Sequence, residues 1–349
     1  MFDKNEIYWK QLEKSFLEDC KRHRIDDPEI VELRKSAPLY RDLSGTRVTA
    51  VRAMYANEKV DCKTIAKSMI LEGNVYSIQK LAEFNLTYQC IGRGGEHLYL
   101  RYPECSYDSY FQAPDFEWTM IKQKSTKCAL LFMDRKDYCL CPIWGIGAFF
   151  LYGGLCREEF TGATKDYVFP RLHNMRKDKV ANALTESIKR HIKKTFPDDV
   201  AKQHSVRSLR KGAMTMNRCN RSLSTQEEYA RSGHTAPDAN SHAEGYIETT
   251  ATMSAPAGRA LAGYFDPHAH AVPMSFGCIS PQCQDSLDNF VSKMFANDVD
   301  CLKPDGKLRE LLLSCAACMI GWYNHFKADY GNVHPIVKKI QHAAKYAGL

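Results

Sequence analysis

Three residues in the second half of the chain have the types and the spacing needed to break and rejoin a phosphodiester. Arg210 lies in S-V-R-S-L-R-K-G-A-M-T, His234 in S-G-H-T follows 24 residues later (234 − 210), and Tyr246 in E-G-Y-I-E follows after a further 12 (246 − 234). A guanidinium matches the extra negative charge of a five-coordinate phosphate with permanently charged donors, and a histidine adds another donor. A tyrosine hydroxyl, with an ordinary pKa near ~10, needs such a cationic surround to become a nucleophile. Together the three types predict metal-free cleavage of a DNA strand.

These segments resemble the sequence boxes of the tyrosine recombinases of the phage-integrase type and, within them, the eukaryotic Crypton transposon recombinases. The S-L-R-K-G-A-M-T segment is similar to the second box, with Arg210 as its arginine and Arg207 where the family usually has a histidine. An alternative register pairs His204 with Arg207, so His204 is a second choice for that role. Among the tyrosines, Tyr229 precedes His234 and Tyr264 lies 30 residues beyond it (264 − 234), which leaves Tyr246 as the expected nucleophile.

The resemblance calls for another arginine far upstream, and the segment Y-Q-C-I-G-R-G-G-E-H-L-Y-L-R at residues 88–101 supplies one. Arg93 resembles the family's first arginine, and Glu96 resembles the acidic residue that often holds the turn. The glycines at 92, 94 and 95 let the backbone approach a phosphate closely. A G-R-G-G stretch alone is more often an ordinary loop, so the inference depends on its order relative to the other boxes.

The family also carries a lysine in a hairpin turn, which resembles a general acid for the departing 5′ oxygen. Here two β-rich runs, 116–121 and 128–133, flank the turn K-Q-K-S-T-K. Lys124 is the first choice, because the K-S-T that it opens resembles the family's K-T-x form. Lys122 is the second choice and Lys127 the third, and for two of the three a solvated basic turn is the plain interpretation.

The resemblance implies a 3′-phosphotyrosine intermediate. Tyr246 attacks the scissile phosphate, Arg93 and Arg210 neutralise the developing charge, His234 assists, and a lysine protonates the 5′ leaving group. A 5′-hydroxyl of another strand then reverses the step, so we expect no metal, cofactor or ATP. The predicted function is transposon-type DNA recombination or integration. Two alternatives stay open: a catalytically silent DNA-binding protein derived from a recombinase, and a topoisomerase of type IB.

Charge and composition agree with a DNA-binding protein without proving one. The 349 residues carry a net charge of +7, and the hydrophobic fraction of 44% suffices for a substantial core. Within fifteen residues (221 − 207 + 1) the second box holds five positive charges, of which Lys211, Arg218 and Arg221 are the expected phosphate contacts. The expected partner is double-stranded DNA. The family further implies self-association as a dimer or tetramer on DNA, and we expect no membrane partner.

The 14 cysteines favour buried thiols in a reducing compartment over disulfides or zinc. We expect no secretory signal, and no apolar run approaches ~20 residues. Cys315 and Cys318 lie in L-L-L-S-C-A-A-C-M-I-G-W, which is typical of a buried helix, so a metal site is not predicted. The chain is expected to be intracellular, and the family implies the nucleus.

The elements that must position these residues are mostly helices. Helical spacing occurs at 59–90 and at 180–196, where Val180, Leu184, Ile188 and Ile192 share one face, and apolar helices are predicted at 141–154 and 308–326. The predicted fold is α+β, mainly α-helical, with a small antiparallel sheet in a tyrosine-recombinase-like catalytic domain. The predicted domains are a helical N-terminal arm at 1–54, the catalytic domain at 55–270 and a C-terminal helical extension at 271–349.

Overall fold

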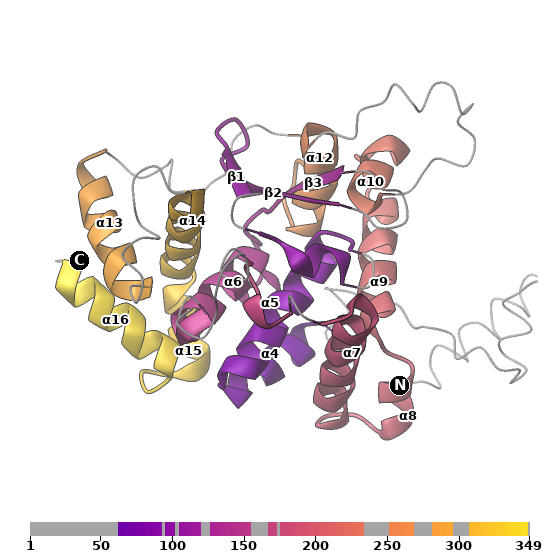
Figure 1. The fold of residues 1–349 in the computed structure, drawn as a ribbon, viewed down its shortest axis with the longest axis horizontal. Coiled ribbons are helices and arrows are strands. Elements are labelled where there is room, and N and C mark those ends of the chain that lie inside the picture. Colours follow the sequence, from indigo (N-terminus) through magenta and orange to yellow (C-terminus); the bar gives the residue numbers. More distant parts are fainter. Residues whose placement is uncertain are drawn as a thin grey trace, which may run out of the picture. The chain divides into compact units, whose positions relative to one another are not determined.

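One helix, buried along almost its whole length, lies at the centre of the fold. Helix α5 (Val75–Gln89) buries each residue from Ser77 to Gln89. It begins in a capping box: the Asn74 side chain accepts a hydrogen bond from the Ser77 amide, and the Ser77 hydroxyl accepts one from the Asn74 amide. Four helices pack against it, namely α4 (Cys62–Glu72), α6 (Pro142–Phe149), α7 (Lys177–Lys193) and α9 (Val206–Cys219), as Figure 1 shows.

The computed structural model describes residues 62–92, 95–101, 105–119, 126–154, 167–172, 175–233, 251–268, 281–295 and 307–347. All of them belong to one unit, Val51–Leu349. The predicted arm at 1–54 lies outside the described residues. The described part is mainly helical with one small antiparallel sheet, which confirms the predicted fold class at that level. Its remaining helices are α8 (Asp198–Lys202), α10 (Thr225–Ser232), α12 (Ala251–Leu261), α13 (Pro281–Phe295), α14 (Lys307–Gly321), α15 (Tyr323–Tyr330) and α16 (Pro335–Ala347).

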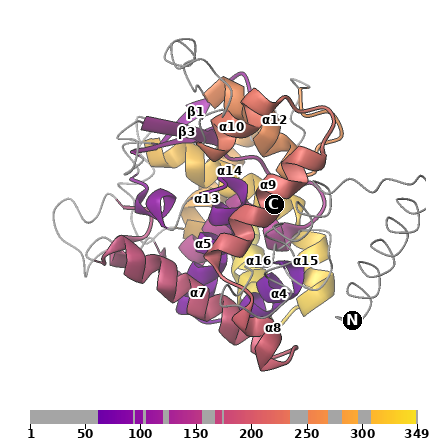
Figure 2. The same ribbon diagram turned by 90° about the vertical axis from the view of Figure 1, so that its right-hand side faces the viewer.

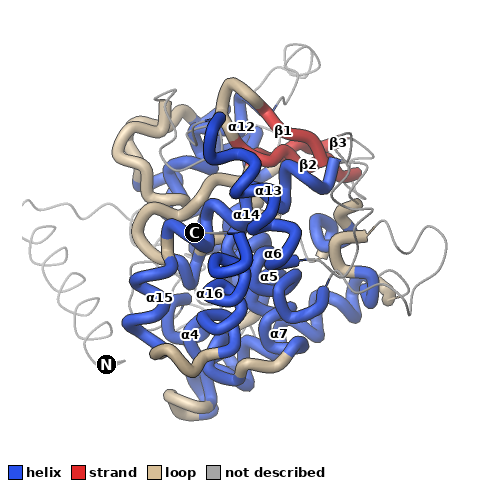
Figure 3. The backbone as a smooth tube through the Cα atoms, turned by 90° about the vertical axis from the view of Figure 1, so that its left-hand side faces the viewer, coloured by secondary structure: helices blue, strands red, loops and turns tan. Residues whose placement is uncertain are grey.

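The sheet has three strands in the order β1-β2-β3, and both pairs are antiparallel. Strands β2 (Ala113–Thr119) and β3 (Thr126–Leu130) correspond to the two predicted runs, with both strands starting two or three residues earlier. Strand β1 (Cys105–Asp108) was not predicted, because four residues carry too short an alternation to be recognised. Figure 3 shows the sheet at one end of the helices, and Figure 2 shows α10 and α12 close to it.

Helix α7 confirms the face predicted from its periodicity. Val180, Leu184 and Ile188 are fully buried and Ile192 is nearly so, while most of the charged residues between them are exposed. The segment 308–326, predicted as one helix, is divided at Trp322 between α14 and α15. Helix α14 packs on α6 and β1, so that one hydrophobic core runs from Cys62 to Ala343.

The nine cysteines whose side chains the structure describes are free thiols, as predicted. Cys315 and Cys318 are buried in α14, and the Cys318 sulfur lies 3.5 Å from that of Cys141. Across the described ranges, no cluster of histidine, cysteine and acidic residues could hold a metal ion. In that same part of the chain, no helix is long and apolar enough to cross a membrane.

Candidate active site

Arg210 is the member of the predicted constellation that the structure describes, and it projects from α9. The helix begins at Ser205 in a capping box with Ser208. Val206, Leu209 and Ala213 turn toward the core, which leaves Arg210 half-buried at the edge of the buried face. Its Nη1 donates to the carbonyl oxygen of Ile91, and its Nη2 donates to that of Ser232 at 2.8 Å. One guanidinium therefore joins two segments that lie 141 residues apart (232 − 91).

Both segments lead directly to predicted site residues. Ile91 precedes Arg93 by two residues, and Ser232 precedes His234 by two. Arg93 and His234 themselves, together with Tyr246, lie outside the described residues. So do Lys122 and Lys124, which follow the end of β2, whereas Lys127 pairs with Trp118 between β2 and β3. The structure thus places Arg210 against Ile91 and Ser232, the residues just before two of the predicted site residues.

The backbone before Arg93 has an unusual conformation. Ile91 has φ 50°, in the left-handed region that a β-branched residue rarely adopts. Gly92 follows, and a Cβ there would lie 1.9 Å from Nδ1 of the His97 imidazole, so only glycine fits at that position. The buried His97 ring is held in turn by a 2.9 Å hydrogen bond between its Nε2 and the Thr87 hydroxyl. Gly95, with φ 100°, begins the short 3₁₀ turn Glu96–Tyr99.

The other predicted residues of the second box divide between the core and the surface. His204 is buried, and its Nδ1–H donates to the Val200 carbonyl at 2.8 Å. Arg207 and Lys211 are exposed one turn apart on α9, and Arg221 is exposed just beyond its end. Arg218 lies on the same face as Lys211 and pairs with Glu228 at 2.9 Å. The exposed side of α9 therefore carries several basic side chains, of which Arg218 is paired with an acidic residue.

Arg231, which the sequence analysis missed, lies three residues before His234 in α10. Its side chain is fully buried; Nε donates to the Gln89 carbonyl and Nη2 to the Leu130 carbonyl, each at 2.9 Å. Helix α10 ends at Gly233, whose φ of 65° places it in the left-handed region that favours glycine. A charged residue in a short polar helix usually faces solvent, so nothing in the local pattern marked Arg231 as buried.

No family model, curated protein or solved structure matches this chain.

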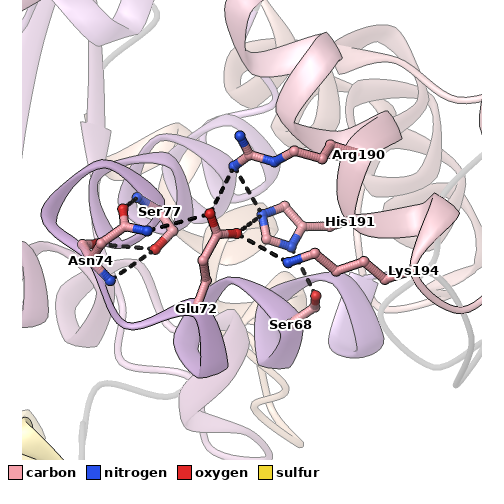
Figure 4. A network of polar contacts seen from close by, with 7 residues as sticks. All are labelled: Ser68, Glu72, Asn74, Ser77, Arg190, His191 and Lys194. Atoms are coloured by element: carbon pink, nitrogen blue, oxygen red, sulfur yellow. Dashed lines mark hydrogen bonds and ion pairs between the residues drawn. The ribbon is translucent and has the colours of Figure 1, made fainter.

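A second group of polar side chains, which the sequence did not predict, joins α4 to α7. Figure 4 shows Ser68 and Glu72 of α4 on either side of the His191 ring. Ser68 Oγ lies 2.8 Å from Nδ1, and Glu72 Oε2 lies 3.2 Å from Nε2. Lys194 and Arg190 also reach the Glu72 carboxylate, at 3.1 and 3.5 Å. We refer to Ser68, Glu72, Arg190, His191 and Lys194 as the α4–α7 network.

The serine, histidine and glutamate of this network have the order of a nucleophilic triad, but the electrostatics do not suit one. Burial, followed by the charge of Lys194, lowers the pKa of His191 to about 4, although Glu72 acts to raise it. A histidine base works best with a pKa near the operating pH. At neutral pH His191 is therefore an uncharged link between two helices and a weak base toward Ser68.

Proposed function

We propose that the chain cleaves and rejoins double-stranded DNA as a tyrosine recombinase, with Tyr246 as the nucleophile. The observation that carries the proposal is the position of the Arg210 guanidinium, which binds the Ile91 and Ser232 carbonyls. Arg93 and His234 follow Ile91 and Ser232 by two positions each, and two residues of chain span at most about 7 Å, so the proposal assigns both to the surroundings of Arg210. The proposed site would then take its two arginines and its histidine from neighbouring parts of the fold, and Tyr246 from the segment that precedes α12 in the chain.

Two further observations support this assignment. The positive φ of Ile91 places local backbone strain, worth about 1–3 kcal/mol, next to the segment that carries Arg93, and such strain tends to occur at functional sites. A guanidinium has five N–H donors in a planar fork, which allows it to hold backbone carbonyls and a phosphate together. Arg210 would thus fix the site and stabilise charge on the phosphate.

The proposed reaction breaks the P–O5′ bond and forms a P–O bond to Tyr246, whose hydroxyl proton is lost to solvent as it attacks. Arg93 and Arg210 stabilise the charge on the non-bridging oxygens, and His234 donates a further hydrogen bond. Lys124, with Lys122 as the second choice, gives its proton to the leaving 5′ oxygen. A 5′-hydroxyl then attacks the phosphotyrosine and releases Tyr246. Paired sites on DNA would require the chain to self-associate, and a DNA substrate in a eukaryotic cell places the reaction in the nucleus.

The structure bears on the choice of nucleophile through Tyr264. This tyrosine is buried, and burial raises the pKa of its hydroxyl above the ordinary value, although Arg259 acts to lower it. A raised pKa disfavours the phenolate, so Tyr264 is poorly suited to attack a phosphate. Tyr246 remains the proposed nucleophile.

The experiment is to recover protein bound covalently to DNA, under denaturing conditions and without crosslinker, from cells expressing the chain. Tyr246→Phe is expected to abolish these adducts, whereas Tyr229→Phe, the matched control in α10, is expected to retain them. Adducts that persist in Tyr246→Phe would exclude this nucleophile. Sequencing of the attached DNA would identify the target.

A catalytically silent DNA-binding protein is the second candidate. The exposed basic side of α9 supports it as well as it supports a recombinase, because both would bind DNA. It predicts that both tyrosine variants bind DNA with an affinity that falls steeply with salt, and that neither forms adducts. A topoisomerase of type IB would form adducts on single sites and relax supercoiled DNA as a monomer. A requirement for two sites would exclude it.

A further inference from the structure

Arg231 contacts several chain segments that lie next to proposed site residues. It projects from α10, three residues before His234. Its Nε binds the carbonyl of Gln89, the last residue of α5 and four residues before Arg93. Its Nη2 binds the carbonyl of Leu130, the last residue of β3, which begins just after the turn with Lys122 and Lys124. One side chain therefore joins α10 to the ends of α5 and β3. The chain continues from α10 and α5 to His234 and Arg93, whereas the turn with the lysines precedes β3, at the opposite end of that strand from Leu130.

Helix α12 supplies the space for this guanidinium. A Cβ on Gly258 would lie 2.9 Å from both Cζ and Nη2 of Arg231, and 3.1 Å from Nη1. Helices α10 and α12 pack directly on each other, and they lie side by side in Figures 1 and 2. Gly258 therefore admits the guanidinium between the two helices. A fourth segment, the helix that follows Tyr246 in the chain, thereby packs against the same side chain.

Burying a charged guanidinium is energetically unfavourable, so Arg231 must do more than fill space in the core. Burial lowers the pKa of this guanidinium, although it stays protonated at neutral pH, and nearby Asp115 acts in the opposite direction. Asp115 faces Leu130 across the β2–β3 pair, next to the carbonyl that Arg231 binds. A leucine or methionine would fill the same volume without burying a charge, so the bound carbonyls explain the presence of arginine. A lysine could not bind both of them through a rigid fork.

We propose that Arg231 is a positioning residue that aligns the segments carrying Arg93, the turn lysine and His234, with Gly258 as the space that it requires. This inference rests on the proposed function. Arg231 would not touch DNA itself. Its loss would misalign the groups around the phosphate and leave the DNA-binding surface of α9 in place. The rate of the covalent step would then fall, whereas the affinity for DNA would not.

The test uses the purified full chain and a fluorescent pool of nicked, random-sequence duplexes, in which the nick traps the covalent product. Three variants are compared with the wild type and with Tyr246→Phe: Arg231→Lys, Gly258→Ala and the control Gly147→Ala. Gly147 is matched to Gly258, since its added Cβ would also meet a side chain at 2.9 Å, in this case Met319 on α14. The readouts are the adduct rate at saturating DNA, the half-saturating DNA concentration and the unfolding midpoint.

The inference predicts that Arg231→Lys and Gly258→Ala slow adduct formation about 10²-fold, because small misplacements of reacting groups have effects of that size. The half-saturating DNA concentration should stay within about threefold of the wild-type value, and Gly147→Ala should react at nearly the wild-type rate. Gly258→Ala also replaces a helical glycine by a better helix former, so a lower rate with an undiminished unfolding midpoint would exclude simple loss of structure. If Arg231→Lys does not fold, Gly258→Ala decides the question.

Three outcomes would overturn the inference. Adduct rates in Arg231→Lys and Gly258→Ala no lower than in Gly147→Ala would reject the positioning role and leave the proposed function intact. A parallel loss of DNA affinity and adduct rate would assign Arg231 to the general stability of the fold. No adduct from the wild type would refute the proposed function, and the inference with it.

Discussion

Arginines next to the proposed site and the α4–α7 network use similar residue types in different ways. Arg210 and Arg231 donate to backbone carbonyls of α5, β3 and α10, or of residues directly after them. In the α4–α7 network, Glu72 and His191 form hydrogen bonds and ion pairs with other side chains (Figure 4). A side chain that binds carbonyls determines where the backbone runs, whereas a side-chain pair mainly adds stability between helices that are already packed. Under the proposed function, Arg210 and Arg231 position the site, whereas the α4–α7 network stabilises the fold.

The largest effect is expected at Arg210. Arg210→Ala should lower the adduct rate about 10³-fold, because it removes the proposed charged donor to the phosphate and releases the Ile91 and Ser232 carbonyls. The measurement is the rate of denaturation-resistant adduct formation at saturating DNA. Glu72→Gln, which changes the α4–α7 network and the contact of Glu72 with Asn74, should react at the wild-type rate. Equal rates for Arg210→Ala and Glu72→Gln would remove the distinction between the two regions.

Much of the fold followed from the sequence because its determinants are local. The buried face of α7 could be predicted from a four-residue period of apolar residues, and the β2–β3 hairpin from two β-rich runs around a polar turn. The contacts of Arg231 could not be predicted, because its carbonyl partners lie 142 and 101 residues away in the chain. For Gly92 the sequence predicted a close approach of the backbone to a phosphate, whereas the reason seen in the structure is steric, because a Cβ there would meet the ring of His97, five residues away. Local pattern suggested the boxes, whereas the proposed aligning contacts of Arg231 depend on the tertiary fold.

The next largest effect concerns the pH dependence of stability. The pKa of His191 is about 4 in the folded protein and near 6.5 when unfolded, so the unfolded state binds more protons between these values. The stability that neutral His191 contributes is therefore complete above pH 6.5 and is lost as the pH falls toward 4. Relative to His191→Gln, the wild type should lose about 2 kcal/mol of unfolding free energy between pH 7 and pH 4.5.

Denaturant titrations of both proteins across that range provide the measurement. Burial raises the pKa of Asp115 to about 6 and that of Asp134 to about 7, which makes folding more favourable as the pH falls. Both carboxyls are present in the two proteins, so their effect cancels in the difference between the curves. Parallel curves would mean that His191 titrates normally and that the network does not hold it neutral.

A smaller effect is expected from Glu72→Gln. Burial acts to raise the pKa of Glu72, but the hydrogen bond from Lys194 and the charge of Arg190 outweigh it, so the pKa lies below its ordinary value. Neutralising this carboxylate should lower the unfolding free energy at pH 7 by about 1–2 kcal/mol, because Lys194 and Arg190 lose their shared partner. Calorimetric or denaturant unfolding gives the value. Asp178→Asn, which breaks the exposed pair with Arg176, serves as a control that should change little.

The smallest effect is expected from Lys194→Met, and it distinguishes charge pairing from packing within the α4–α7 network. Lys194 is about half exposed, so its pair with Glu72 should contribute only about 0.5 kcal/mol, and high salt should remove that difference. Because the charge of Lys194 also helps to lower the pKa of His191, the variant should shift that pKa toward 6.5 and flatten the acid limb of the stability curve. NMR titration of the His191 ring measures the shift directly. If the pKa of His191 stays near 4 in the variant, burial alone lowers it. The α4–α7 network would then hold its helices together by packing and not by charge.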